Sequence, residues 1–410
     1  MQIRITSPSQ IETTIQLPSS KSISNRVLII NALGKGKDHP QNLSECDDTE
    51  VMVKALAGAH QPVIDIKAAG TAMRFLTAYL AVTPGERIIT GTDRMKQRPI
   101  QLLVDALQSL GARISYEEKE GFPPLRIEGK ALHGKEISLP GNISSQYISA
   151  LLMIAPVLPN GIKLSLTGEI ISKPYINLTI ELMKQFGAIV NWTDGRTIEV
   201  QPKKYRSIPF FVESDWSAAS YWYQIAALCP QSSITLPYLY KNSLQGDSKV
   251  ADLFLRLGVE TIFTDHGVQL QKGDVTIENF EYNFINQPDL AQTFVVTCAL
   301  MQIPFRFEGL QSLKIKETDR MAALICEMKK LGYVLHEEGG SILYWDGERC
   351  KADEKPVIDT YDDHRMAMCF APACLAVPML WINHPEVVSK SYPRYWEDLK
   401  QAGFKFEKEE

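Results

Sequence analysis

The residues best suited to acid–base chemistry lie in one charged run that holds Lys316, Glu317 and Arg320. The apolar stripe after this run predicts a helix, which we expect Thr318 or Asp319 to cap. Cations at the positive end of a helix dipole are unfavourable unless an anion is bound there. A carboxyl group among them can donate or accept a proton once burial and its partners set its pKa. The run therefore predicts an anion site with its own proton-transfer group, and a plain surface run of charges is the alternative.

The same combination of small polar residues and cations recurs where other helices are predicted to begin. Backbone N–H groups at such positions bind anions, and small residues let the anion come close. The segments are Ser19–Arg26, Gly70–Arg74, Ser144–Tyr147 and Asp362–Met366. A single one is most often an ordinary capped helix with a solvated base nearby, but their joint occurrence favours bound anions.

Asp289 follows a Gln-Pro pair just ahead of another predicted helix. By itself this position is more typical of a helix N-cap, and a general base is the alternative. Both roles stay open at this point.

These segments belong to a repeated pattern in which an amphipathic helix ends in a glycine and leads into a β-rich segment. Glycine suits that position because it adopts the left-handed conformation that commonly ends a helix. The pattern occurs six times, at Gly58, Gly111, Gly187, Gly258, Gly332 and Gly403. The intervals of 53, 76, 71, 74 and 71 residues have room for two helices and several strands each. We therefore predict six α/β units in two domains of three, with chain crossings near residues 17–20 and 205–215.

Composition excludes several classes of protein. The 410 residues are 45% hydrophobic and 22% charged, with a net charge of −5, which is ordinary for a folded enzyme and argues against nucleic-acid binding. Seven cysteines without a CxxC pair suggest reduced thiols, and the scattered histidines predict no metal site. Phosphate-loop and serine-hydrolase motifs are missing from the sequence, as are a signal peptide and an apolar stretch long enough to span a membrane. We expect a cytoplasmic enzyme without a metal or other cofactor.

Taken in chain order, the motifs resemble those of the 5-enolpyruvylshikimate-3-phosphate synthase (3-phosphoshikimate 1-carboxyvinyltransferase) family. The resemblance runs nearly end to end. It is carried by the segments at residues 17–26, 70–74, 93–100, 144–146, 172–175, 316–320 and 363–368.

The resemblance implies an α/β fold of two domains, each made of three βαβαββ repeats in an inside-out α/β barrel, with the active site in the cleft between them. It assigns residues 1–17 and 214–410 to one domain and residues 18–213 to the other. It implies transfer of the enolpyruvyl group of phosphoenolpyruvate to the 5-hydroxyl of shikimate 3-phosphate, on the pathway to chorismate and aromatic amino acids. A monomer that binds neither nucleic acid nor membrane is expected.

The resemblance also implies roles for individual residues. Asp289 would be the base, Glu317 the acid, and Lys21 a further catalytic group. Shikimate 3-phosphate would be bound by Lys21, Ser22, Arg26, Ser144, Ser145, Gln146, Ser172, Tyr175, Asp289, Ser312 and Lys316. Phosphoenolpyruvate would be bound by Lys21, Gly70, Arg98, Gln146, Arg320, Arg365 and Lys390.

Three positions depart from the family pattern. Ala68 and Phe75 flank the Gly70 segment where asparagine and proline are frequent, and Ser312 replaces an asparagine. These changes put local contacts in doubt and suggest an altered sensitivity to glyphosate. The nearest rival, UDP-N-acetylglucosamine enolpyruvyl transferase, usually carries a cysteine ahead of the Arg98-Pro99 pair, and none is present there. A non-catalytic anion-binding module is the alternative from another class.

Overall fold

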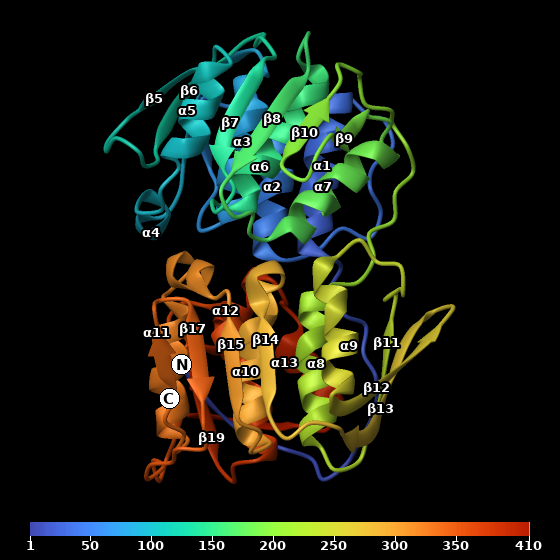
Figure 1. Ribbon diagram of the computed structural model, residues 1–410, viewed down its shortest axis with the longest axis vertical. Coiled ribbons are helices and arrows are strands. Elements are labelled where there is room, and N and C mark those ends of the chain that lie inside the picture. The colour runs from blue at the N-terminus through green and yellow to red at the C-terminus, as the bar shows by residue number, and fades with distance from the viewer. Residues whose placement is uncertain (410) are drawn as a thin grey trace. The chain divides into compact units, whose positions relative to one another are not determined.

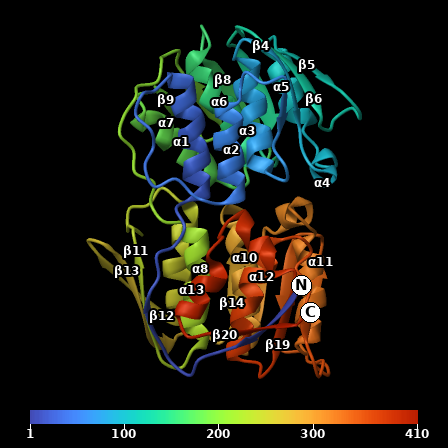
Figure 2. The ribbon, with the colours of Figure 1, turned by 180° about the vertical axis from the view of Figure 1, so that it is seen from behind.

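The computed structural model describes residues 1–409 and divides the chain into two compact units. Unit 1 is Met1–Pro18 with the chain from Glu213 onward, and unit 2 is Ser19–Val212. The chain therefore leaves unit 1 after its first two strands and returns to it some two hundred residues later. Figures 1 and 2 show the ribbon from opposite sides.

Unit 1 is built from three four-stranded sheets, counted over the described residues, and all three have the same order. The first two strands of each sheet are parallel and the remaining pairs are antiparallel. The orders are β2-β11-β13-β12, β14-β15-β17-β16 and β18-β19-β1-β20. The strands are β1 (Gln2–Thr6), β2 (Ile11–Thr14), β11 (Ser232–Pro237), β12 (Leu257–Thr264), β13 (Gly267–Val275), β14 (Phe280–Asn283), β15 (Phe305–Glu308), β16 (His336–Glu338), β17 (Ile342–Trp345), β18 (Val357–Ile358), β19 (Leu380–Asn383) and β20 (Lys405–Glu409). Strand β1 therefore completes the sheet of the last repeat, as expected if the N-terminal strand joins the C-terminal half.

Each sheet of unit 1 is paired with two helices, so that the order along each repeat is βαβαββ. The helices are α8 (Trp216–Leu228), α9 (Val250–Leu255), α10 (Ala291–Leu300), α11 (Arg320–Lys330), α12 (His364–Phe370) and α13 (Tyr395–Gln401), with short 3-10 turns at Gly246–Lys249, Phe284–Asn286, Pro288–Leu290, Gln311–Ile315, Ala371–Leu375 and Pro385–Lys390. The first helices of the three repeats, α8, α10 and α12, pack against one another and are buried almost all round. Helices that are buried on every face belong in a core, so these three helices lie inside and the sheets outside.

Unit 2 repeats this plan twice in full. Its sheets have the orders β3-β4-β6-β5 and β7-β8-β10-β9. The strands are β3 (Val63–Asp65), β4 (Gly85–Thr90), β5 (Arg113–Tyr116), β6 (Leu125–Gly129), β7 (Glu136–Pro140), β8 (Ile162–Thr167), β9 (Val190–Trp192) and β10 (Thr197–Val200). The helices are α1 (Lys21–Gly34), α2 (Asp47–Ala57), α3 (Gly70–Ala81), α4 (Asp93–Lys96), α5 (Gln101–Ser109), α6 (Ser145–Ile154) and α7 (Lys173–Gln185), with a 3-10 turn at Ala155–Val157. Helices α1, α3 and α6 contact one another, like their counterparts in unit 1.

The third repeat of unit 2 keeps its two helices, α1 and α2, but its sheet is reduced. Among residues 1–409, its strand pairing is represented by a single parallel bridge between Gln41 and Phe211. The segments that would form the ladder contain Pro40, Pro202 and Pro209, which have no N–H to donate. The bridge still joins two segments about 170 residues apart in the chain.

The left-handed conformation expected of these glycines is present at five of the six positions, although Gly258 lies inside β12, two residues past the C-cap of α9. Their φ angles lie between 77° at Gly258 and 97° at Gly403, in the left-handed region. Gly58, by contrast, has φ −92° and belongs to the repeat with the reduced sheet, so the prediction is wrong there. None of the helices in residues 1–409 is long and apolar enough to cross a membrane.

Candidate functional site

In unit 1, the start of α11 gathers the carboxylates and cations that the sequence singled out. Asp319 caps the helix, accepting hydrogen bonds from the N–H groups of Met321 and Ala322, so the cap prediction is confirmed. Arg320 is the first helical residue and is almost fully buried. Its Nη2 donates to Glu317 Oε2 at 2.9 Å, and Lys390 Nζ lies 3.0 Å from the other oxygen of Glu317. Glu317 is thus held between two cations.

Asp289 lies in the same cluster and receives three cations. Arg365 Nη2 donates to Asp289 Oδ2 at 2.9 Å, and Arg320 Nη1 lies 3.4 Å from Oδ1. Lys316 Nζ lies 3.5 Å from the same Oδ1. The N-cap interpretation of Asp289 is wrong: the residue sits in the 3-10 turn Pro288–Leu290, and α10 begins without a side-chain cap. Its carboxylate is committed to the cation cluster instead.

Asp363 is a further carboxylate that holds residues of this cluster in place. It is fully buried and binds Arg320 through both oxygens, at 2.7 Å to Nε and 3.2 Å to Nη2. It also caps α12, accepting a hydrogen bond from the N–H of Arg365 at 2.9 Å. One carboxylate therefore holds the guanidinium group of Arg320 and the backbone at Arg365, and the paired hydrogen bonds to Arg320 suit its planar group.

The surrounding charges lower the pKa of Asp289 and raise the pKa of Arg320. Burial by itself would raise the pKa of Asp289, but the positive charges of Arg365, Lys316 and Arg320 outweigh it and hold the pKa far below its usual range. Burial would lower the pKa of Arg320, and the carboxylates of Asp363, Glu317 and Asp289 raise it instead. Both groups are therefore fully ionised near neutral pH.

In unit 2, Arg26 is buried among neutral partners. Its Nε donates to Thr179 Oγ1 at 2.7 Å, and Nη2 donates to Ser149 Oγ at 3.3 Å. The carbonyls of Ser22 and Tyr175 accept from Nη1 and Nη2, at 2.8 and 3.4 Å. Burial lowers the pKa of Arg26 to about 10, which leaves it charged near neutral pH. Phe75, which departs from the family pattern, contacts this residue: the Arg26 guanidinium lies over its buried ring, 5.3 Å from the centroid.

Lys21 opens α1, which Ser20 caps. Its Nζ lies 3.3 Å from Asp48 Oδ2, and both side chains are largely buried. Three further predicted residues occupy helix starts: Ser144 caps α6 and accepts from the N–H of Gln146, Ser145 is the first residue of α6, and Ser172 precedes α7 in a left-handed conformation.

Gly70 opens α3 in a crowded place. A Cβ atom there would lie 2.6 Å from Nη1 of Arg98 and 2.9 Å from Nη1 of Arg74, so a larger residue would displace both guanidinium groups from the helix start. Gln146 Nε2 donates to Thr71 Oγ1 at 3.0 Å, which ties α6 to the same helix start. Unit 2 thus brings Gly70, Arg98 and Gln146 together.

Two further predicted residues, Ser312 and Lys390, lie in 3-10 turns of unit 1. Ser312 falls in the 3-10 turn Gln311–Ile315 ahead of Lys316, and Lys390 ends the turn Pro385–Lys390.

Sequence analysis missed several partners of the predicted residues. Ser149 and Thr179 come one helical turn after Ser145 and Tyr175, so the spacing of four residues was a usable signal. Asp48 lacked such a signal, because it meets Lys21 only through the packing of α1 on α2.

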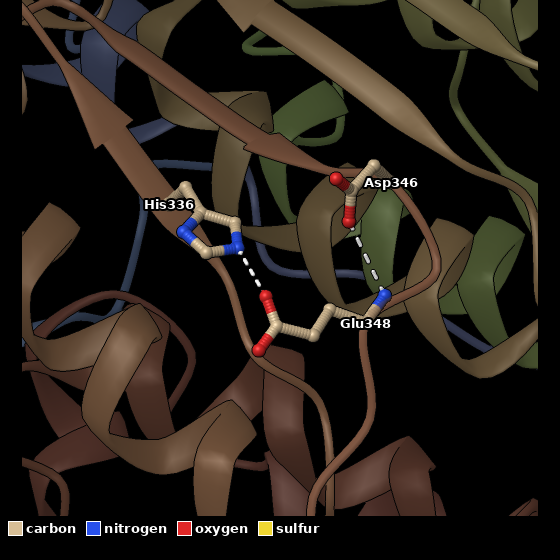
Figure 3. A group of neighbouring side chains, drawn as sticks. All are labelled: His336, Asp346 and Glu348. Carbon is tan, nitrogen blue, oxygen red and sulfur yellow. Dashed lines mark hydrogen bonds and ion pairs between the residues drawn. The ribbon is translucent and has the colours of Figure 1, made fainter.

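A group of potential metal ligands, His336, Asp346 and Glu348, was also not anticipated (Figure 3). The β16–β17 hairpin brings their ligand atoms within 4.8 Å of one another. His336 Nε2 already lies 2.8 Å from Glu348 Oε2, and the two carboxylates are exposed. Surface groups that bond to each other in this way need no ion.

Comparison with solved structures defines the fold class first. EPSP synthases from Acinetobacter baumannii superpose on this chain with TM-scores of 0.80 and 0.79, covering 100% of both chains at 20% and 19% identity. The fold is therefore that of the two-domain, inside-out α/β barrels.

Sequence comparison then defines the family. Residues 5–61 and 56–399 match the family described as EPSP synthase (3-phosphoshikimate 1-carboxyvinyltransferase). A 3-phosphoshikimate 1-carboxyvinyltransferase of Bacteroides fragilis is 64% identical over 98% of this chain and 98% of its own. One of Sulfurovum sp. is 36% identical over 95% and 96%. The chain belongs to the EPSP synthase family.

Proposed function

We propose that this enzyme is a 3-phosphoshikimate 1-carboxyvinyltransferase, which transfers the enolpyruvyl group of phosphoenolpyruvate to the 5-hydroxyl of shikimate 3-phosphate and releases phosphate. The observation that carries the proposal is the cluster of Asp289 and Glu317 among four cations. A site that only bound anions would gain nothing from two carboxylates on the same cations, whereas addition followed by elimination needs both a proton acceptor and a proton donor.

Asp289 is the proposed base. In the addition step, the 5-oxygen bonds to C2 of the enolpyruvyl group as Asp289 takes the hydroxyl proton. In the free enzyme the surrounding cations hold its pKa far below the usual range, which makes it a weak base. Substrate carboxylate and phosphate groups that bind Arg365, Arg320 and Lys316 would share these charges and raise the basicity of Asp289. The base would thus become effective only with substrate present.

Glu317 is the proposed acid. It would protonate the methylene carbon C3 as the C2–C3 double bond opens, which gives a tetrahedral intermediate. In the elimination, C3 loses a proton, the C2–O bond to phosphate breaks and the double bond forms again. The cations Arg320 and Lys390, which contact Glu317, would stabilise the negative charge of the departing phosphate.

The substrate sets follow the chemistry of their residues. Planar arginine pairs suit a carboxylate, and lysines suit phosphate as compact charges. We propose that phosphoenolpyruvate is bound by Lys21, Gly70, Arg98, Gln146, Arg320, Arg365 and Lys390. Shikimate 3-phosphate is bound by Lys21, Ser22, Arg26, Ser144, Ser145, Gln146, Ser172, Tyr175, Asp289, Ser312 and Lys316. Lys21 serves as a catalytic cation as well.

We also propose that the two compact units are domains with borders at residues 17/18 and 213/214. The division of the chain after Pro18 and after Val212 supports these borders. A cytoplasmic monomer is the expected form, and gel filtration with light scattering tests the monomer.

The test is to mix the purified enzyme with shikimate 3-phosphate and phosphoenolpyruvate and to follow phosphate release. Release should require both substrates, and Glu317→Gln should lower kcat by about 10²–10⁴-fold because the amide cannot supply the proton. Glu386→Gln, a substitution of an exposed glutamate in the same unit, is the matched control and should keep full activity. Binding of both substrates without release would leave an anion-binding module, and release with UDP-N-acetylglucosamine as acceptor would change the substrate.

A further inference from the structure

The loop that leads into α12 has an uncommon backbone. Tyr361 and Asp362 are successive non-glycine residues with φ 54° and 53°, in the left-handed region that side chains rarely adopt. The next residue, Asp363, binds Arg320 and caps α12, and Arg365 follows two positions later. A loop in such a conformation persists only when its surroundings hold it there.

Glu327 on α11 is the residue that holds this loop. Its Oε1 accepts a hydrogen bond from Tyr361 Oη at 2.6 Å, and Oε2 accepts from the N–H of Asp359 at 3.0 Å. Its side chain is fully buried, and Lys330 Nζ lies 2.7 Å from Oε2. A buried carboxylate is costly to desolvate, so its contacts have to be satisfied on both oxygens.

Lys330, in the next turn of α11, makes further contacts with the beginning of the same loop. Its Nζ donates to the carbonyl of Val357 and to Asp359 Oδ2, both at 2.8 Å. Asp359 also accepts from Asn383 Nδ2 at 2.7 Å, which ties the start of the loop to β19. The loop is therefore fixed at its beginning through Asp359 and in its middle through Tyr361.

Helix α11 holds the loop at two points. Arg320 binds Asp363 at the far end of the loop, and Glu327 comes seven residues later, which is about two helical turns and returns to the same face. The spacing of Arg320 and Glu327 along α11 thus sets where Asp363, and through it the first turn of α12, can lie.

We propose that Glu327 is a positioning residue for phosphoenolpyruvate binding: by fixing the Asp359–Asp363 loop, it sets the orientation of the Arg320 guanidinium group and the position of the first turn of α12, which carries Arg365. The inference depends on the proposed function for the identity of the ligand, and it adds a residue that no step of that mechanism uses. Glu327 acts through Asp363 and touches no substrate.

The test is a graded series, Glu327→Leu, Glu327→Gln and Tyr361→Phe, with KM measured separately for each substrate. Glu327→Leu removes both loop contacts, Glu327→Gln keeps one good acceptor, and Tyr361→Phe removes one hydroxyl. The KM for phosphoenolpyruvate should rise about five- to tenfold in Glu327→Leu and by less in the other two, in that order. The KM for shikimate 3-phosphate should change less than about twofold, since Arg26 and its partners are untouched.

Tyr223→Phe is the matched control. Tyr223 is a buried tyrosine of the same unit, and its hydroxyl bonds Thr261 Oγ1 at 2.9 Å, away from the loop. Because Tyr223 is fully buried and Tyr361 is 38% exposed, Tyr223→Phe should lose at least as much thermal stability as Tyr361→Phe, with both KM values unchanged. Equal KM changes for both substrates, or a fall in kcat alone that follows the loss of stability, would overturn the proposal.

A binding measurement separates this inference from the proposed function. Inorganic phosphate should raise the Tm of the wild-type enzyme, and the rise should be smaller in Glu327→Gln at every phosphate concentration. This readout needs no turnover, so wild-type enzyme that releases no phosphate from the two substrates would remove the proposed function alone. An identical phosphate-dependent rise in Tm in wild type and in Glu327→Gln would remove the positioning role alone.

Discussion

Arg320 in unit 1 and Arg26 in unit 2 are both buried arginines near a helix start, but their partners differ in charge. Arg320 binds three carboxylates, and they raise its pKa in spite of burial. The described partners of Arg26 are hydroxyls and carbonyls, and burial lowers its pKa to about 10. The same side chain is thus stabilised as a charge in one unit and only tolerated as a charge in the other.

The difference shows what each cation can do for a ligand. A bound anion at Arg26 would supply the charge compensation that the neutral partners lack. At Arg320 and Arg365 an incoming anion must compete with Asp289 and Glu317, and in doing so it changes the basicity of those carboxylates. In the proposed mechanism, unit 2 binds the substrate anions, whereas unit 1 couples binding to proton transfer.

The largest expected effect comes from removing each arginine. Arg320→Met leaves three carboxylates without their shared cation and should cost about 3–5 kcal/mol of unfolding free energy. Arg26→Met should cost about 1–3 kcal/mol, because Ser149 and Thr179 still bond each other at 2.8 Å. Denaturant unfolding of both variants measures the difference. Lowering the pH from 7 to 5 should shrink the deficit of Arg320→Met alone, and equal deficits at both pH values would refute the comparison.

Asp247 is a buried carboxylate of unit 1 that, unlike Asp289, is destabilised as a charge. It is buried and accepts a hydrogen bond from Ser217, and burial together with the negative charge of Asp289 raises its pKa to about 6. Because the folded protein binds this proton more tightly than the unfolded chain, the penalty of ionising Asp247 develops between about pH 4 and pH 6 and is complete above that. Asp247→Asn should therefore gain up to about 3 kcal/mol of stability at pH 8 and nothing at pH 4. Urea unfolding across this range checks it, and a gain that is constant with pH would contradict it.

Local signals in the sequence predicted the helix starts well. Asp319 was one of two expected caps of α11, and Arg320 was expected in the first turn, where the structure has it as the first helical residue. The sequence also indicated an anion beside Arg320. It could not indicate that the protein supplies anions of its own, because Asp363 lies 43 residues away and reaches Arg320 only through the packing of α11 and α12.

The repeated glycine pattern shows the same difference between local signals, which the sequence reveals, and long-range pairing, which it does not. Four glycines follow the C-cap of a helix in the left-handed conformation and Gly258 adopts it inside β12, but Gly58 does not, and the repeat that contains Gly58 has lost its ladder. A helix cap depends on a few neighbouring residues. A ladder depends on two segments that meet from about 170 positions apart, and both of these segments contain prolines, which cannot donate to a ladder.

The smallest expected effect is also the most direct test of the comparison. In the free enzyme the Asp289 carboxylate occupies Arg365 and approaches Arg320 and Lys316. Asp289→Asn replaces this internal anion with a neutral amide of nearly the same shape, so an external anion no longer competes with a charge. Inorganic phosphate should therefore bind about tenfold more tightly, as measured by calorimetry, while turnover falls because the proposed base is gone.

The matching change in unit 2 is Thr179→Val, which removes a neutral partner of Arg26. No internal anion is released there, so the variant should bind phosphate no more tightly than wild type. Two results would contradict this prediction: phosphate binding by Asp289→Asn that is as weak as in wild type, or an equal gain in affinity in both variants. Either result would mean that the carboxylate of Asp289 does not compete with ligands for the cations of unit 1. The base would then need another means of becoming effective, since its depressed pKa would persist when substrate binds.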